Sequence, residues 1–327
     1  MPDLPLIAPM LATPGTLPHP REDHRWAYET KLDGQRCVSY LPGDGTLRLR
    51  ARSGEDITAA YPELRGLATA LGSTSAVLDG EIVALDERGH SDFELLQQRM
   101  GLAGSPAKAA RMAAEVPTQL MLFDVMLLGG EALLDRPYEE RRATLESLGL
   151  RGPGWSTPAA IVGHGEAALA ATRERGLEGV VCKRTDSRYA PGVRSRAWVK
   201  IRNIRTIDVI IGGWLPGKGR LSGLPGAVLV GVPDEGALRF VGAVGTGWTD
   251  RERQTLAELL SVAETPHCPF AERPPVAGAR WAVPRLVGEV RYSTLTRAGY
   301  LRQPSWHRLR PDLAREDLTR DSTREGL

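Results

Sequence analysis

A lysine set among charged residues and a glycine turn is the first feature of this sequence that could do chemistry. In the segment ETKLDGQR, Lys31 is accompanied by Glu29, Asp33 and Arg36, and Gly34 follows the aspartate. A lysine amine is a nucleophile only after losing its proton, which a neighbouring cation or burial favours. Glycine permits a sharp turn, so a bulky phosphate can approach the backbone. The segment could hold a covalent nucleophile, although so short a pattern also fits a hairpin turn with a surface lysine.

Four further segments place an acid, an aromatic ring or a lysine among apolar residues. Glu81 lies in LDGEI and Phe123 in LFDV; the other two segments are EGVVCK and WVKIR. Each has an ordinary interpretation, since Glu81 could be an exposed strand position and Phe123 plain core. Glu178 and Lys183, at the ends of EGVVCK, could form a surface ion pair. The order of the segments along the chain is therefore more informative than any one of them.

The elements that must position these residues are mainly short strands. Residues 26–41 are expected to form two strands around a tight turn at Asp33 and Gly34. The apolar run 119–128 predicts a buried strand, and the Pro-rich first residues are expected to be irregular. Further strands are expected at 46–52, 76–85, 178–184 and 197–202, and helices at 61–71, 93–100, 138–148 and 166–175.

After residue 205 the pattern changes to short strands separated by glycine turns. Strands are expected at 208–214, 227–232, 238–244 and 286–292, with one helix at 250–262. Several short strands with a single helix are typical of a small barrel such as an OB-fold. We therefore predict an α+β protein with two domains, residues 1–204 and 205–327.

Composition narrows the class of protein. The chain has 327 residues, of which 42% are hydrophobic and 25% charged, as in an ordinary globular protein. The three cysteines are scattered, no apolar run approaches ~18 residues, and the N-terminus lacks a secretory pattern. We expect a cytoplasmic, nucleoid-associated protein that does not enter a membrane.

The net charge of +2 says little about the partner, but the distribution of charge says more. Residues 183–220 include ten basic residues and only two acids, which suits a polyphosphate partner or a solvated surface.

Lysine, acid, aromatic, acid and lysine, in that order and each on its own strand, resemble the covalent nucleotidyltransferase superfamily. That superfamily comprises DNA ligases, RNA ligases and mRNA capping enzymes. Arg36, the RSG that begins at Arg52, and the stretches SRYAPGVRSRAWVK and LRQPSW look like bacterial ATP-dependent DNA ligases. The nearest resemblance is to the ligase module of bacterial non-homologous end-joining ligases or their stand-alone relatives, from about Trp26 to Arg310. It implies an adenylation domain of antiparallel sheets with flanking helices, followed by an OB-fold domain.

The resemblance also implies roles for residues. Lys31 would attack the α-phosphate of ATP and carry AMP. Phe123 would stack on adenine, Glu29 would contact its amino group, and Glu81 would meet the ribose. The implied phosphate and nucleotide ligands are Arg36, Arg52, Lys183, Lys200 and Arg202. Glu178, with Asp33 second, would bind Mg²⁺ or Mn²⁺.

Two positions depart from the pattern of the relatives. Arg202 stands where many of them have lysine, and Arg310-Pro-Asp-Leu313 lacks the lysine that usually ends this motif. The second departure weakens the expectation of efficient self-adenylation.

The function that this resemblance implies is the sealing of nicks in duplex DNA during repair, by a monomer. Nicked double-stranded DNA would be the substrate, and a DNA-end-binding repair protein is a candidate partner. The alternatives are an RNA ligase or a capping enzyme, and a non-catalytic nucleic-acid-binding relative.

Overall fold

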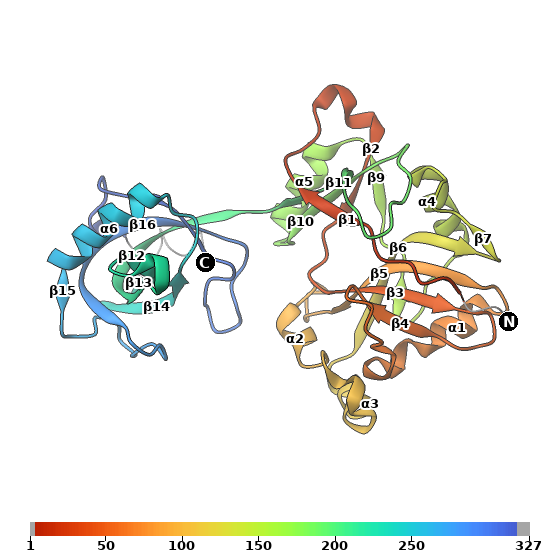
Figure 1. Cartoon of the computed structure of the whole chain (residues 1–327), viewed down its shortest axis with the longest axis horizontal. Helices are drawn as coiled ribbons and strands as arrows, with labels where there is room; N and C mark the ends of the chain where they lie inside the picture. Colours follow the sequence, from red (N-terminus) through yellow and green to blue (C-terminus); the bar gives the residue numbers. More distant parts are fainter. Residues whose placement is uncertain (1–3, 319–327) are drawn as a thin grey trace. The chain divides into compact units, whose positions relative to one another are not determined.

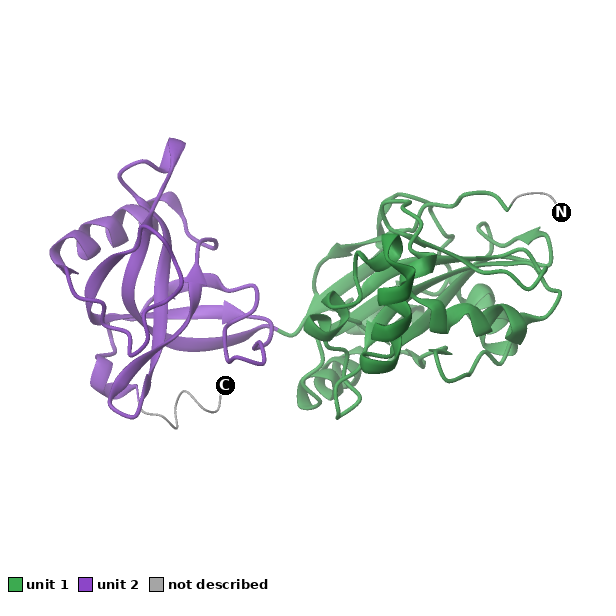
Figure 2. Ribbon diagram, turned by 90° about the horizontal axis from the view of Figure 1, so that it is seen from below, with its two compact units in different colours: residues 1–203 green, residues 204–327 purple. Residues whose placement is uncertain are grey.

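The chain folds into two compact units, Met1–Asn203 and Ile204–Leu327 (Figure 2). The structure is a computed structural model, and it describes residues 4–318. Each unit has hydrophobic core clusters of its own. None of the helices within residues 4–318 has the length and apolar character needed to cross a bilayer.

The first unit is built on two sheets (Figure 1). Every strand pair in them is antiparallel except β1 with β11 and β6 with β8. The five-stranded sheet has the order β1 (Leu11–Pro14), β11 (Arg194–Arg202), β10 (Gly179–Arg184), β2 (Trp26–Thr30) and β9 (Ala160–Val162). The six-stranded sheet has the order β4 (Arg48–Ala51), β3 (Gln35–Leu41), β5 (Ala76–Ala84), β6 (Thr118–Leu128) and β7 (Glu131–Ala132), and β8 (Trp155–Ser156) pairs with β6.

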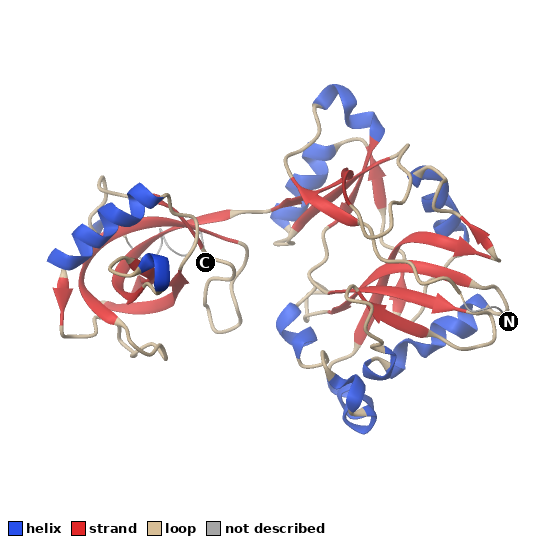
Figure 3. Cartoon of the chain, in the orientation of Figure 1, coloured by secondary structure: helices blue, strands red, loops and turns tan. Residues whose placement is uncertain are grey.

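Helices flank both sheets (Figure 3). Helix α5 packs against β10 and β2, and α4 packs against β6. The α-helices of this unit are α1 (Gly66–Leu71), α2 (Phe93–Gln97), α3 (Pro106–Glu115), α4 (Tyr138–Ser147) and α5 (Gly165–Glu174). Its 3₁₀ turns are η1 (Pro20–Arg25), η2 (Thr58–Ala60), η3 (Pro62–Arg65) and η4 (Leu102–Gly104). This arrangement confirms the predicted fold class of antiparallel sheets with flanking helices.

Strand β6 is buried on both faces, which accounts for its nearly continuous apolar sequence. Leu120 and Leu122 belong to the core cluster that also includes Leu67 of α1 and Leu145 of α4. Phe123 points to a second cluster, which includes Val38 of β3 and Trp198 of β11. This second cluster joins side chains of the two sheets, so it sets the spacing between them. A strand with two buried faces favours a nearly continuous run of apolar residues.

The strands β2 and β3 exist as predicted, but they do not form a hairpin. Strand β2 belongs to the five-stranded sheet and β3 to the six-stranded sheet. The residues between them carry the chain from one sheet to the other, and Lys31 lies at this crossing, where its amide donates to the carbonyl of Gly179 at 2.8 Å. Gly34 is required here because a Cβ would lie 2.3 Å from the carbonyl oxygen of Ile82. The hairpin interpretation was therefore wrong, since the turn residues serve a crossover.

The second unit is a curled antiparallel sheet covered by one helix, which agrees with the predicted OB-like fold. Its order is β14 (Ala237–Val244), β13 (Pro225–Asp234), β12 (Arg205–Pro216), β16 (Arg280–Tyr292) and β15 (Glu264–Thr265), and β17 (Ser305–Leu309) pairs with β16. Helix α6 (Asp250–Val262) begins with a capping box in which Thr249 and Glu252 each bond the other's amide. Two 3₁₀ turns, η5 (Gly219–Leu221) and η6 (Arg315–Asp317), complete the unit.

Candidate nucleotide-binding site

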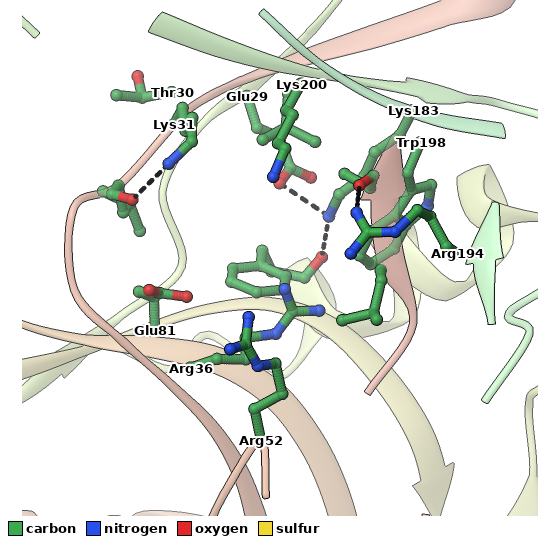
Figure 4. A pocket seen from close by; sticks show the side chains of 15 residues that line it. Glu29, Thr30, Lys31, Arg36, Arg52, Glu81, Lys183, Arg194, Trp198 and Lys200 are labelled. Atoms are coloured by element: carbon green, nitrogen blue, oxygen red, sulfur yellow. Dashed lines mark hydrogen bonds and ion pairs between the residues drawn. The ribbon is translucent and has the colours of Figure 1, made fainter. Parts of the chain in front are cut away.

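A pocket of about 190 Å³ opens between the two sheets of the first unit. Figure 4 shows lysines from the five-stranded sheet above it and Arg36 and Arg52 below it. Among its lining residues are eight that the sequence singled out: Glu29, Lys31, Arg36, Arg52, Glu81, Phe123, Lys183 and Lys200. The other three predicted site residues, Asp33, Glu178 and Arg202, do not line it. Residues that lie more than 150 positions apart in the sequence thus meet around one space.

Glu178 lies beside the pocket because it holds the lysine that does line it. The Lys31 Nζ donates to Glu178 Oε2 at 2.5 Å, and both side chains are largely buried. The other carboxylate oxygen of Glu178 lies 3.2 Å from Nε of Arg202. A carboxylate between two cations keeps the amine in a fixed position at the pocket wall. Glu178 therefore links the Lys31 amine to the Arg202 guanidinium.

Positive charge gathers on the five-stranded side of the pocket. Burial lowers the pKa of Lys200, and the nearby cations Arg202 and Lys31 lower it further. Lys200 pairs in register with Val181 of β10, so β11 brings it over the pocket. Cations that are crowded together and partly desolvated are a favourable environment for phosphate oxygens.

The aromatic Phe123 is contacted by cations. The Arg36 guanidinium lies 4.6 Å from the centre of its ring, and the Lys183 Nζ lies 4.5 Å from it. Trp198 meets the same ring edge to face, with ring centres 6.4 Å apart. The pocket wall therefore offers an aromatic surface held between charged groups, which can stack with a base.

Glu29 is the centre of a buried polar network. Its carboxylate accepts hydrogen bonds from Tyr138 Oη at 2.5 Å and Arg142 Nη1 at 3.5 Å, and it forms an ion pair with Lys183 Nζ at 2.8 Å. The Lys183 Nζ also donates to the Phe123 carbonyl at 3.2 Å, and burial lowers the pKa of this lysine. A ligand that contacts Glu29 would therefore share this carboxylate with three protein donors.

Glu81 is a pocket acid whose pKa is raised. Burial raises its pKa to about 7, the cations Arg36 and Lys31 oppose the shift, and the acids Asp79 and Glu178 add to it. Glu81 lies opposite Arg36 in the β3–β5 register. This carboxyl is thus able to change its charge near neutral pH.

Asp79 is a residue of the site that sequence reasoning missed. It is fully buried, and its two oxygens accept from Nε and Nη2 of Arg36 at 2.7 and 2.6 Å. One signal could have revealed it: an acid within the apolar strand AVLDGEIVA needs a buried partner. The other lining residues that were not assigned a role are Leu11, Ala12, Thr30, Leu32, Val181, Arg194 and Trp198.

The side chains that could hold a divalent metal are few. Among residues 4–318, no group of three or more His, Cys, Asp or Glu side chains is arranged for a metal ion. Mg²⁺ commonly takes only one or two protein carboxylates and completes its shell with phosphates and water. Glu178 supplies one such carboxylate beside the pocket, where its two oxygens contact Lys31 and Arg202. Asp33 contributes its amide to a hydrogen bond with the Ser91 hydroxyl at 3.4 Å.

Comparison with known proteins assigns both units to one family. Residues 9–202 match the family model described as ATP dependent DNA ligase domain, and residues 222–313 match the ATP dependent DNA ligase C terminal region. The chain is 41% identical over 319 residues to the multifunctional non-homologous end joining DNA repair protein LigD of Mycobacterium tuberculosis, covering 96% of this chain and 40% of that protein. It is 34% identical to a DNA ligase of Methanoculleus marisnigri, covering 97% of this chain and 57% of that enzyme.

Solved structures give the same result. The chain is similar to the crystal structure of the ligase domain of M. tuberculosis LigD, with 40% identity, a TM-score of 0.55, and coverage of 96% of this chain and 98% of that one. A mycobacterial DNA ligase D complexed with ATP and MES matches with a TM-score of 0.56 at 40% identity over 96% and 98% of the two chains. The chain spans about two fifths of the length of the LigD proteins that it matches. The two family matches, together with the residues that line the pocket, show that this chain belongs to the family of ATP-dependent DNA ligases.

Proposed function

We propose that this chain seals 3′-hydroxyl/5′-phosphate nicks in duplex DNA by way of an AMP carried on Lys31. The observation that carries the proposal is the position of the Lys31 amine, at the wall of a pocket lined by cations and an aromatic ring. The ammonium gives its proton to solvent, and Nζ then forms a bond to the α-phosphorus of ATP. The bond from that phosphorus to the bridging oxygen breaks, and pyrophosphate leaves.

The remaining side chains position the nucleotide and balance its charge. Phe123 supports the adenine, with Glu29 and Lys183 at its edge, and Glu81 contacts the ribose. Glu178, with Asp33 second, would hold Mg²⁺ or Mn²⁺, and such a cation neutralises phosphate charge. The cations that contact phosphate oxygens are Arg36, Arg52, Lys200 and Arg202, and they act where negative charge develops.

Two further steps complete the proposed reaction. The DNA 5′-phosphate displaces Lys31 from the AMP phosphorus, which gives a DNA adenylate. The 3′-hydroxyl then attacks the 5′-phosphorus and AMP leaves. In this proposal residues 1–204 carry the adenylation chemistry and residues 205–327 bind the duplex.

The names of the relatives support a role in end joining. The LigD proteins at 40–41% identity are described as non-homologous end joining proteins. We therefore include a DNA-end-binding repair protein as partner in the proposal. Action as a monomer and a place in the cytoplasm at the nucleoid are further parts of it, which these names do not address.

Mass spectrometry of the purified chain tests the central step. After incubation with ATP and Mg²⁺, the wild type should gain one AMP of about 330 Da on Lys31, because the covalent amine is the carrier. Lys31→Ala should gain none and should not seal a nicked duplex. Lys108→Ala, a change of an exposed lysine on α3, is the matched control and should behave like the wild type.

Parallel reactions separate the alternatives. Labelling with GTP instead of ATP would point to capping chemistry, and sealing of nicked RNA but not DNA would point to an RNA ligase. A wild-type chain that never acquires AMP would leave the non-catalytic alternative.

A further inference from the structure

A buried tyrosine connects three distant parts of the first unit. Tyr189 lies in the segment between β10 and β11 and is 3% exposed. Its hydroxyl donates to Asp79 Oδ2 at 2.5 Å and accepts from the amide of Met10 at 2.9 Å. The tyrosine therefore links β5 to the N-terminal segment that precedes β1.

The same two partners also hold Arg36. Asp79 accepts from Nε and Nη2 of Arg36, and the Met10 carbonyl accepts from Nη2 at 3.1 Å. Within the described part of the chain, the hydrogen bonds of this guanidinium use only Nε and Nη2. A side-on grip of this kind fixes the plane of the guanidinium and directs Nη1 away from the carboxylate. Arg36 lines the pocket, so Nη1 is the edge that a nucleotide can reach.

We propose that Tyr189 is a positioning residue for the nucleotide: its hydroxyl holds Asp79 in place, and Asp79 holds Arg36 across the Phe123 ring with Nη1 presented to the ligand. The proposal rests on the proposed function, because it takes the pocket to be the nucleotide site. Tyr189 itself acts only through Asp79 and Arg36.

The network has the properties that such a role requires. Burial and the neighbouring Asp79 raise the pKa of Tyr189 well above its ordinary value, so the hydroxyl remains a donor at working pH. Asp79 is fully buried, and without the hydroxyl its Oδ2 would keep Arg36 as its one remaining donor among residues 4–318. A buried carboxylate that loses a donor can shift to find another, and in this proposal Arg36, which it holds, shifts with it.

The chain contains a matched control for the removal of this hydroxyl. Tyr40 is also buried, and its hydroxyl accepts from the Ile7 amide at 3.0 Å and donates to the Ile7 carbonyl at 3.2 Å. It therefore fastens the same N-terminal segment but has no hydrogen bond to Asp79 or Arg36. Tyr189→Phe and Tyr40→Phe remove the same oxygen, and the ring of residue 189 can keep its edge-to-face contact with Trp198, at 5.7 Å.

A double-mutant cycle with Arg36→Ala tests the proposal. The rate of AMP transfer to the chain is measured in single turnovers at saturating ATP. The temperature is kept well below the lowest thermal unfolding midpoint among the variants. Tyr189→Phe should slow this step roughly tenfold in the wild-type background, the effect of one lost hydrogen bond to a charged group. In the Arg36→Ala background it should change the rate by less than about twofold, because the group it positions is gone. Tyr40→Phe should have little effect in either background.

The outcomes distinguish this inference from the proposed function. A wild-type chain that takes up no AMP refutes the proposed function, and this inference with it. If the wild type is adenylated but Tyr189→Phe transfers AMP at the wild-type rate, or is equally slow with and without Arg36, only the role of Tyr189 is refuted. An equal loss in Tyr40→Phe would show that general fastening of the N-terminal segment is responsible, and would also refute it.

Discussion

Glu81 is the residue whose charge should make the stability of the protein depend on pH. Its pKa of about 7 in the folded chain lies above the ordinary value of 4.5, so the folded state holds a proton that the unfolded state has released between these values. The stability contributed by this proton is complete below about pH 4.5 and is lost as the pH rises through 7. Glu81→Gln cannot ionise, so its free energy of unfolding should exceed that of the wild type increasingly from pH 5 to 8.

The gain at pH 8 should be at most about 3 kcal/mol, and less to the extent that water screens this partly buried group. Urea unfolding at several pH values measures it, with the exposed Glu87→Gln as control. A difference that does not vary with pH would contradict the prediction.

At the residue scale, the residues proposed to contact the nucleotide could be predicted from the sequence, whereas the residues that hold them in place could not. Lys31, Glu81 and Phe123 were recognisable because their types and order match a known set of motifs, and the structure places all three around one pocket. Asp79 and Tyr189 were not recognisable, because their hydrogen-bond partners are distant in the sequence. Arg36 and Asp79 are 43 residues apart, and Asp79 and Tyr189 are 110 residues apart. Their roles depend on a three-dimensional contact that no local pattern encodes.

The first residue of β10 should be among the least replaceable in the first unit. Gly179 has φ of +140°, and a Cβ on it would lie 2.0 Å from the carbonyl oxygen of Ile201 on β11. Its own carbonyl accepts from the Lys31 amide, and the adjacent Glu178 holds the Lys31 amine. Gly179→Ala should therefore cost about 1–3 kcal/mol of stability or more, and should slow the transfer of AMP to the chain.

Chemical denaturation and the AMP-transfer rate measure the two effects. The control is Gly104→Ala, because Gly104 has no positive φ and a Cβ there meets nothing within 4 Å. Similar stabilities for the two variants would show that the β10–β11 contact relaxes without cost.

At the scale of elements, local patterns predicted most strands and helices but not their pairing. The strands near 119–128 and 178–184 were evident from apolar runs. Strand β1 lies in the segment expected to be irregular, and that expectation was wrong for Leu11–Pro14, because its partner β11 is about 180 residues away. Helix α3 and strand β17 were not predicted either. The β2–β3 hairpin was misread for the same reason, since sheet membership is decided by contacts distant in sequence.

The division of the whole molecule has a physical cause at Asn203. Its amide nitrogen Nδ2 donates to Thr172 Oγ1 at 3.0 Å and to the Leu177 carbonyl at 2.8 Å, and the side chain is buried. The next residue, Ile204, is 63% exposed. Asn203 thus fastens the end of the first unit to the segment around α5, and the second unit begins directly after it.

Because the two units have separate cores, a nucleotide should stabilise only one of them. The pocket belongs to the first unit, so an ATP analogue with a methylene between the α- and β-phosphorus, which cannot transfer AMP, should raise that unit's unfolding temperature. A ligand at a hundred times its Kd adds about 2.7 kcal/mol to the stability of the state that binds it.

A pair of tryptophans allows the unfolding of the second unit to be followed separately. In that unit, Trp248 stacks on Trp306 with ring centres 4.8 Å apart, and the circular dichroism of this pair reports the unfolding of the second unit. Calorimetry should show two transitions, of which the analogue shifts one, while the temperature at which the tryptophan signal is lost stays constant. One transition that moves as a whole with the analogue would instead mean that the two cores unfold together and that nucleotide binding also stabilises the second unit.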